Sequence, residues 1–418
     1  MKRQHRRTGI VALLVAALVI AASCSAPGGA GGGSEEGPIK IGFLYPATGV
    51  FAAPGQFMRE GLELFLKQND SEIAGREVEV VRADTKGDPN QMLTQARRLV
   101  EREEVDFLFG PLSAAEGAAL MPFLKQRQVA AVYPIASTDD ITQRTPSEFI
   151  ARTGWSSSQT THPFGEYAYD ELGYRKVATI GFDFSFSWES VGGFVRTFQE
   201  KGGTVARQLW APIGTTDYSP YLSRIPTDVD AVLVSFSGSA AVQFINQYQQ
   251  FGLDAPMIAQ GNTTDESTLE ETGPAAEGIV SALHYSAAID SPENTEFVEA
   301  YEKEYGHVPS YYAEGTYTSA LLIDQAMESL DGGFSDAQEL VQAIREASIE
   351  APRGPIEFDD HGNVIENVYI REVEPVEGAL QNTVIDTFED VSQFWSYDPD
   401  QFLEDPTYSR EFPECNGC

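Results

Sequence analysis

Apolar and polar positions follow two alternating patterns along this chain. Short apolar runs typical of buried strands alternate with longer segments in which apolar residues recur at helical spacing. In the first part of the chain, the runs at Ile39–Leu44, Glu77–Val81, Val105–Phe109 and Val129–Tyr133 predict four strands. The segments between them predict helices. This βαβαβαβ order predicts a parallel sheet with helices on both faces.

Local signals mark where the helices of this first unit begin. Asp88-Pro89 combines a capping residue with a proline at the first helical position. Ser113, followed three residues later by Glu116, matches a capping box. Gln56–Gln68 has apolar residues on one helical face, which predicts an amphipathic helix.

A second unit of the same kind follows, and a different pattern closes the chain. The strands predicted for the second unit are Phe149–Arg152, Lys176–Gly181, Thr204–Leu209, Ala231–Phe236 and Pro256–Ala259. Its predicted helices are Gln159–Leu172, Trp188–Lys201, Tyr218–Arg224 and Ala240–Phe251. Three helices then follow at Thr295–Tyr305, Ser310–Leu330 and Ala337–Glu346, with late strands at Gly354–Phe358 and Asn367–Arg371. A late helical block followed by late strands indicates that the chain returns to the first unit and then to the second.

The N-terminal residues have the make-up of an export signal. Four basic residues precede the apolar run Ile10–Ala22, whose length of about 13 residues is too short to span ~30 Å of hydrocarbon. Small residues then lead to Cys24, as in a bacterial lipobox, in which the cysteine is acylated. We expect a lipid anchor on Cys24, followed by a Gly-rich flexible tether. An ordinary signal peptide cut near Ala22, which would leave Cys24 as a free thiol, is the alternative.

The net charge limits the partners that the protein can bind, and the cysteines limit its redox and metal chemistry. The formal net charge is −35, and an electrostatic field of that sign repels nucleic acid and anionic lipid. Cys415 and Cys418 form a Cys-Asn-Gly-Cys end, and in an oxidising compartment we expect them to pair with each other. A redox or metal role for this pair is the alternative. No later stretch reaches 18 apolar residues, so we expect the rest of the chain to be soluble.

Several short segments together resemble the Leu/Ile/Val-binding protein family, the branched-chain amino-acid class of ABC solute receptors. The resemblance runs from about Ile39 to Arg371. The segments that carry it are Tyr45–Gly49 (YPATG), Asp84-Thr85 with Gly87–Pro89, Gly110–Ser113 (GPLS), Pro134–Thr138 (PIAST), Asp183–Phe186 (DFSF) and Ala276–Gly278 (AEG). Each is weak alone, but their order and spacing are specific.

The resemblance implies an α/β fold of two doubly wound parallel-sheet lobes, joined by a three-crossing hinge, that close over a small molecule. The expected divisions are a signal peptide (1–23), a tether (24–37), lobe 1 (38–153 plus 286–352), lobe 2 (154–285 plus 353–375) and a C-terminal extension (376–418). We expect the extension to pack on a lobe, because its many aromatic side chains would otherwise be exposed. The implied protein is a lipid-anchored, monomeric receptor on the outer face of the bacterial membrane, which hands its ligand to ABC permease subunits.

Ligands of open α/β sheets bind beyond the carboxyl ends of the strands. The family's positions that hold the ligand's carboxylate correspond to Ser113, Ile135 and Ser137, and Thr138 is adjacent. The helix that starts at Ser113 favours an anion through its exposed N–H groups and its dipole. The alternative is that Ser113 and Ser137 only cap a helix and a turn.

Aromatic residues supply the other candidates. The family often has an aromatic residue at the position of Phe186 that covers the ligand, and Trp188 and Trp155 are further candidates; core or interlobe packing is the alternative for each. Leucine-type members hold the ligand's ammonium with a tyrosine and a glutamate, which align near Ser237-Gly238 and Gln260-Gly261. Gln260 is thus a candidate contact, but neither position carries a carboxylate. The sequence therefore favours an aromatic or hydrophobic acid, or an amide, over a simple amino acid.

An enzyme and a sensor are the competing functions. No G-x-S-x-G, H-E-x-x-H or P-loop sequence occurs, and the histidines beyond the signal do not have metal-ligand spacing. We expect no catalytic residue, no metal and no cofactor. An extracytoplasmic hydrolase and a ligand-sensing receptor of the same fold, which regulates rather than transports, are the alternatives.

Overall fold

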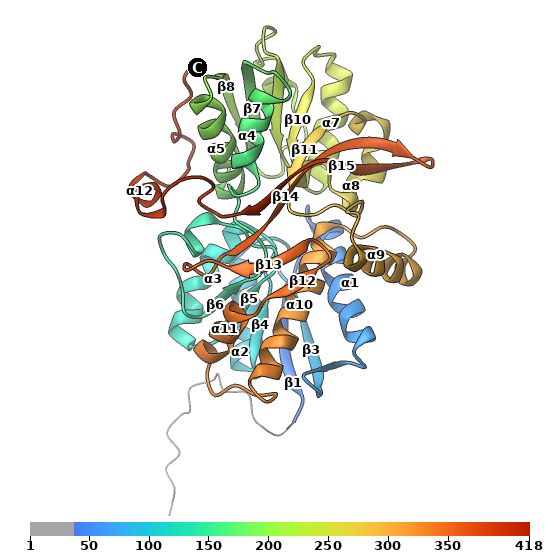
Figure 1. Cartoon of the computed structure of the whole chain (residues 1–418), viewed down its shortest axis with the longest axis vertical. Coiled ribbons are helices and arrows are strands. Elements are labelled where there is room, and N and C mark those ends of the chain that lie inside the picture. The colour runs from blue at the N-terminus through green and yellow to red at the C-terminus, as the bar shows by residue number, and fades with distance from the viewer. Residues whose placement is uncertain (1–36) are drawn as a thin grey trace, which may run out of the picture.

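Two sheets, one in each of two lobes stacked along the long axis, form the framework of the molecule (Figure 1). The structure is a computed structural model and describes residues 37–418; the predicted signal peptide, Cys24 and the tether as far as residue 36 lie outside the described residues. Within residues 37–418, no helix is both long and apolar enough to cross a membrane.

The first lobe is built on a six-stranded sheet with the order β2-β3-β1-β4-β5-β6. All its neighbours pair in parallel except β2, which forms a short hairpin with β3. Strand β1 is almost wholly buried, because α1 and α2 both pack against it and α10 packs against α1. The elements of this part of the chain are β1 (Ile39–Tyr45), α1 (Ala52–Gln68), β2 (Glu72–Ile73), β3 (Arg76–Asp84), α2 (Pro89–Glu101), β4 (Phe107–Phe109), α3 (Ala114–Arg127), β5 (Ala130–Tyr133), the 3-10 turn η1 (Asp139–Ile141) and β6 (Ile150–Arg152).

The second lobe contains the larger sheet, in which β11, β10, β9, β7 and β8 are neighbours in that order and pair in parallel. Its apolar core holds residues of α4 and α5 against the buried strands. The elements here are α4 (Thr161–Asp170), β7 (Lys176–Phe182), α5 (Ser185–Glu200), β8 (Thr204–Ala211), α6 (Ser219–Leu222), β9 (Ala231–Ser235), α7 (Ser239–Phe251), β10 (Met257–Gln260), η2 (Gly261–Thr264), α8 (Glu266–Thr272), η3 (Gly273–Ala276) and β11 (Val280–Leu283).

The chain then returns to the first lobe and crosses again. Helices α9 (Pro292–Tyr305), α10 (Tyr311–Ser329) and α11 (Ala337–Glu346) lie with the first lobe, and the short strands β12 (Ile349–Ala351) and β13 (Gly354–Phe358) form a hairpin beside them. Strand β14 (Val364–Val376) pairs with β13 at its start and with β11 of the second lobe later on. The late helical block and the late strands thus follow the predicted order. The assignment of residues 353–375 to the second lobe stays a prediction, because β13 pairs with β12.

A buried ion-pair cluster joins these crossings. Arg353 is fully buried and donates a hydrogen bond to the backbone oxygen of Thr153, which follows β6 at the start of the first crossing. Its guanidinium lies 3.3 Å from Glu314 of α10 and 3.2 Å from Glu366 of β14. Burial raises the pKa of Glu366 to about 8, although Arg353 favours its ionised form. The cluster therefore ties the first crossing, α10 and the third crossing together at one point.

One long hairpin was not predicted. Strand β15 (Ala379–Val391) pairs antiparallel with β14, and both turn residues, Glu377 and Gly378, have positive φ angles of 51° and 93°. Two successive positive φ angles are typical of the two-residue turn that matches the twist of paired strands. The predicted C-terminal extension thus begins as a strand and continues beyond it with α12 (Pro399–Glu404). The predicted α/β class with two parallel-sheet lobes is confirmed.

Candidate functional site

A small cavity of about 20 Å³ lies between the two lobes. Residues from both sides line it: Phe51, Leu112, Ser113, Ala114, Ile135, Ser137, Tyr311 and Tyr312 from the first lobe, Phe184, Phe186, Ser237 and Asn262 from the second, and Trp155 from the first crossing. Most of them directly follow β4, β5, β7, β9 or β10, so the cavity lies at the carboxyl ends of both sheets, where α/β folds bind ligands.

Helix N-termini converge on this cavity. Phe51, Ser113 and Phe184 are the capping residues of α1, α3 and α5, and Tyr311 begins α10. Ser237 precedes the capping residue of α7. The N-terminus of a helix carries partial positive charge, roughly half an elementary charge, and presents N–H groups without partners in the helix. The lining residues include no Asp, Glu, Lys or Arg. The cavity is therefore neutral in side-chain charge, and the helix dipoles that face it favour an anion.

Ser113 is fixed by a complete capping box. Its hydroxyl accepts from the backbone N–H of Glu116 at 3.2 Å, and the Glu116 carboxylate accepts from the N–H of Ser113 at 3.0 Å. Burial raises the pKa of Glu116, which favours its neutral form and reduces repulsion of a nearby anion. The N–H of Glu116 occupies an acceptor position of the Ser113 hydroxyl, and rotation of that hydroxyl turns its proton either toward the Glu116 carboxylate or toward a ligand. The capping and ligand-binding interpretations of Ser113 are thus compatible.

Ser137 and Ile135 lie on the same side of the cavity, after β5. Ser137 is 3% exposed, and its hydroxyl lies 3.0 Å from that of Ser157, which belongs to the first crossing. The Ser157 hydroxyl also donates to the backbone oxygen of Ser137. This pair joins the two sides of the hinge, and rotation about one C–O bond redirects the Ser137 proton from Ser157 to a ligand.

The remaining walls are aromatic. The Trp155 ring meets those of Phe186 and Tyr311 nearly edge-on, at centroid distances of 6.2 and 6.3 Å, and Phe184 lies beside Phe186. Aromatic rings in such arrangements form a slot suited to a flat apolar group. The indole N–H of Trp155, itself 1% exposed, has no hydrogen-bond partner among the described residues. It is therefore a free donor in the cavity wall.

His284 closes the wall behind these rings. It is fully buried against Trp155 and Tyr311, at ring distances of 5.4 and 5.5 Å. Burial lowers the pKa of His284 well below its usual value, as do the nearby charges of Arg353 and Arg371. The imidazole is consequently neutral and places no charge beside the cavity.

Gln260 was predicted to contact the ligand, but the structure places it outside the cavity. Its side chain turns back to accept the backbone N–H of Asn262 at 2.8 Å and to donate to the Asn262 side-chain oxygen at 3.1 Å. Asn262 in turn donates to the hydroxyl of Tyr311 at 2.7 Å. Asn262 therefore lines the cavity in place of Gln260, and Gln260 fixes its orientation. The hydrogen bond to Tyr311 also links the second lobe to the first.

Thr138 and Trp188 also lie outside the cavity lining. Thr138 donates to the carboxylate of Glu189 at 2.8 Å, and the neighbouring N–H of Asp139 donates to the other oxygen of Glu189 at 3.1 Å. Glu189 belongs to α5, so these bonds join the lobes. Trp188 is half-buried on the same helix. The aromatic residue that does join Phe186 in the cavity is Phe184, from the same loop.

Two buried carboxyl groups make this interlobe contact sensitive to pH. Burial raises the pKa of Asp139 to about 6 and that of Glu189 well above its usual range, and the two charges repel each other. A carboxyl with a raised pKa binds its proton more tightly in the folded protein than in the unfolded chain. Its contribution to stability therefore falls as the pH rises from about 4 through the raised pKa.

The Asp139→Asn variant tests this contact. Asparagine keeps the acceptor for the Ser158 N–H and removes one titrating group. We expect the variant to match the wild type near pH 4.5 and to be more stable at pH 8, as measured by thermal melting across this range. An identical pH dependence for both proteins would show that the carboxyl pair does not titrate as described.

Residues 38–379 match the family model of the periplasmic binding proteins. The chain belongs to the periplasmic binding protein family. The Leu/Ile/Val-binding protein homolog 6 of Brucella melitensis is 31% identical, and the match covers 84% of this chain and 92% of that protein. The resemblance inferred from the short segments is thereby confirmed.

Solved structures of this family share the fold. A solute-binding protein of an ABC transporter from Rhodopseudomonas palustris BisB5, in complex with 3,4-dihydroxybenzoic acid, matches with a TM-score of 0.81 and 31% identity over 86% of this chain and 99% of that one. Another from R. palustris, in complex with benzoate, matches with a TM-score of 0.79 and 27% identity over 85% and 98%. The chain is an ABC transporter substrate-binding protein, and these relatives are solute-binding proteins rather than enzymes.

Proposed function

We propose that this protein captures a small aromatic carboxylate between its lobes for an ABC importer. The observation that carries the proposal is the combination of converging helix N-termini with a lining that has no charged side chain. An anion is stabilised by these helix ends. An amino acid's ammonium group would find no carboxylate in the lining, and an uncompensated buried charge is costly. The site therefore favours an acid over an amino acid.

The rest of the lining favours an aromatic ring on that acid. Trp155, Phe184 and Phe186 supply flat apolar surfaces that suit a single aromatic ring. We assign the carboxylate to the side of Ser113 and Ser137, and the ring to the side of Trp155 and Phe186. Two relatives of this family hold benzoate and 3,4-dihydroxybenzoic acid, which supports the assignment.

The predicted export signal and Cys24 suggest where the protein works. We assign the chain to the outer face of the cell membrane, held by a lipid on Cys24 and by the tether. Lobe closure on the acid would present a surface that the permease recognises. The protein's partners on this proposal are the small acid and the permease subunits.

A thermal-shift panel tests the proposed ligand class. A ligand that binds only the native state stabilises it by RT ln(1 + [L]/Kd), which is about 2.7 kcal/mol at a hundredfold excess over Kd. We expect benzoate or one of its ring-hydroxylated forms to raise the melting temperature by several degrees, and leucine at the same concentration to leave it unchanged. A rise with leucine and none with any aromatic acid would overturn the proposal.

A further inference from the structure

The C-terminal segment beyond β15 lies outside the residues that the family model matches, which end at residue 379. We call residues 392–418 the C-terminal strap. In Figure 1 its helix α12 lies to one side at the level where the lobes meet, and the chain end lies high on the second lobe. The strap has a small apolar core of its own, formed by Phe394, Phe402 and Tyr408. The strap is thus a packed segment that runs from the junction of the lobes along the second lobe.

The strap is bonded to the first lobe through the loop between β5 and β6. Arg144 donates to the backbone oxygens of Asp405 and Phe402, at 2.8 and 3.3 Å. Thr407 donates to the carboxylate of Asp140 at 3.1 Å. The side chain of Thr142 donates to Gln393 at 2.8 Å. Because β5 and β6 belong to the first sheet, these contacts fix the strap to that lobe.

The strap is also bonded to the second lobe, through α4 and α5. The hydroxyl of Tyr408 lies 2.9 Å from a ring nitrogen of the buried His162. Trp395 donates to Glu166 at 2.8 Å, and Tyr397 donates to Glu200 at 2.6 Å. Gly192 of α5 is in close contact with the Tyr408 ring, where an added Cβ would come within 2.7 Å of that ring.

Two arginines, one from each lobe, hold α12 between them. Arg144 of the first lobe and Arg196 of the second lie over the ring of Phe402, at 5.8 and 5.0 Å from its centroid. Both also bind Asp405: Arg144 through the backbone oxygen, and Arg196 through the carboxylate at 3.0 Å. The same short segment is therefore a shared partner of the two lobes.

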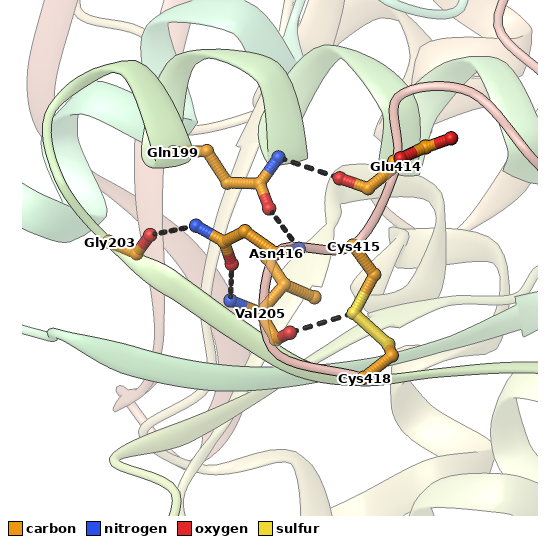
Figure 2. Close-up of a disulfide and its surroundings, with 7 residues drawn as sticks. All are labelled: Gln199, Gly203, Val205, Glu414, Cys415, Asn416 and Cys418. Atoms are coloured by element: carbon orange, nitrogen blue, oxygen red, sulfur yellow. Dashed lines mark hydrogen bonds between the residues drawn. A yellow bond between two sulfur atoms is a disulfide. The ribbon is translucent and has the colours of Figure 1, made fainter.

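The end of the chain is pinned to the second lobe by a disulfide loop (Figure 2). A disulfide joins Cys415 and Cys418, and Asn416 between them pairs with the exposed edge of β8. The Asn416 side chain accepts from the N–H of Val205 at 2.9 Å and donates to the backbone oxygen of Gly203 at 2.9 Å. The disulfide closes a loop of four residues, which restricts the position of the Asn416 side chain. The end of the strap is therefore fixed on the second lobe.

We propose that the C-terminal strap is a fourth interlobe connection that restrains opening of the lobes and so slows release of the ligand. Besides the three backbone crossings, the strap is bonded to side chains of both lobes: Arg144 and Asp140 of the first, and Arg196 and His162 of the second. Rotation of one lobe relative to the other therefore breaks the contacts of Arg144 and Thr407, or those of Arg196 and Tyr408. A contact made in one conformation and lost in another shifts the equilibrium toward the first. This role goes beyond the choice of ligand and does not depend on it.

The double variant Arg144→Ala, Thr407→Val tests the strap, with Arg127→Ala on the surface of the first lobe as the matched control. Small-angle X-ray scattering of the ligand-free proteins is the main measurement. We expect a larger radius of gyration for the double variant than for the wild type, and no change for the control. Thr407→Val alone removes a single hydrogen bond and should give a smaller increase in the radius of gyration. This single variant keeps the test possible if the double variant does not fold.

Ligand release provides the second measurement. If benzoate binds the wild type, its dissociation should be about fivefold faster or more in the double variant, the lower end of typical coupling effects. If benzoate does not bind, the scattering comparison still tests the role of the strap. The proposal for the ligand and the proposal for the strap can therefore be refuted independently. A double variant whose melting temperature falls while its radius of gyration stays at the wild-type value would overturn the strap proposal, because the contacts would then only stabilise the fold.

Discussion

Replacing Arg353 by methionine is expected to lower the free energy of unfolding by about 3–5 kcal/mol at pH 8, the cost of removing one partner from a buried ion pair. Arg353, Glu314 and Glu366 are all fully buried, so the variant leaves two carboxyl groups without their counter-charge. Urea denaturation measures the loss. Since both carboxyl groups have raised pKa values, protonation near pH 5 should recover part of it.

Two comparisons make this result specific. Arg127→Met removes an exposed ion pair with Glu101 and should cost less than about 1 kcal/mol. The triple variant Arg353→Met, Glu314→Gln, Glu366→Gln removes the buried charges together and should be more stable than Arg353→Met alone. A loss for Arg353→Met no larger than that of Arg127→Met would show that this cluster does not hold the crossings together.

The double variant Ser137→Ala, Phe186→Ala is expected to weaken benzoate binding by about two to four orders of magnitude. The serine hydroxyl would lose a hydrogen bond to a charged group, worth about 1.5–3 kcal/mol, and the phenylalanine would lose the apolar contact of a ring, of similar magnitude. Every 1.4 kcal/mol is a tenfold change in Kd. Isothermal titration calorimetry provides the measurement. The two residues come from different lobes, so the double variant tests a site that both lobes share.

The matched control is the double variant Ser223→Ala, Phe251→Ala, which removes the same groups from the surface of the second lobe. Both residues are exposed and neither lines the cavity. We expect its affinity for benzoate to equal that of the wild type. Equal affinities for all three proteins would place the binding site elsewhere in the molecule.

Part of the site was predictable from sequence because it obeys a local rule. Ser113, Ile135, Ser137 and Phe186 all follow strands of parallel sheets, and such positions gather at one edge of a sheet. Ser237 and Asn262 follow β9 and β10 and obey the same rule. From the sequence, Ser237 is named only as a position that lacks the family's usual residue, and Asn262 is not named. Strand periodicity and the order of the motifs were sufficient to find this edge.

Other parts of the site depend on contacts that no local pattern encodes. Tyr311 and Tyr312 reach the cavity from a helix that follows the second crossing, so their position depends on how the lobes meet. Thr138 and Gln260 occupy the expected strand ends, but each side chain is taken by a neighbour: Glu189 of the opposite lobe and Asn262, respectively. A local sequence pattern predicts the backbone position of a residue, whereas its hydrogen-bond partners in the folded protein determine the orientation of its side chain.

The C-terminal region shows the same limit. Its aromatic residues predict that it packs against the protein, because exposed aromatic clusters are unfavourable in water. Strand β15 was missed because its polar residues alternate weakly and its turn is Glu377-Gly378, without the Asn-Gly or Asp-Gly pair that usually signals a tight hairpin. That the segment touches both lobes depends on the folded positions of Arg144 and Arg196.

Calorimetric titration with benzoate and with benzamide tests the central claim most directly, because the two molecules have nearly the same shape and differ in charge. If helix N-termini around an uncharged lining select an anion, benzoate should bind at least tenfold more tightly than benzamide. Equal affinities, or tighter binding of benzamide, would contradict the account.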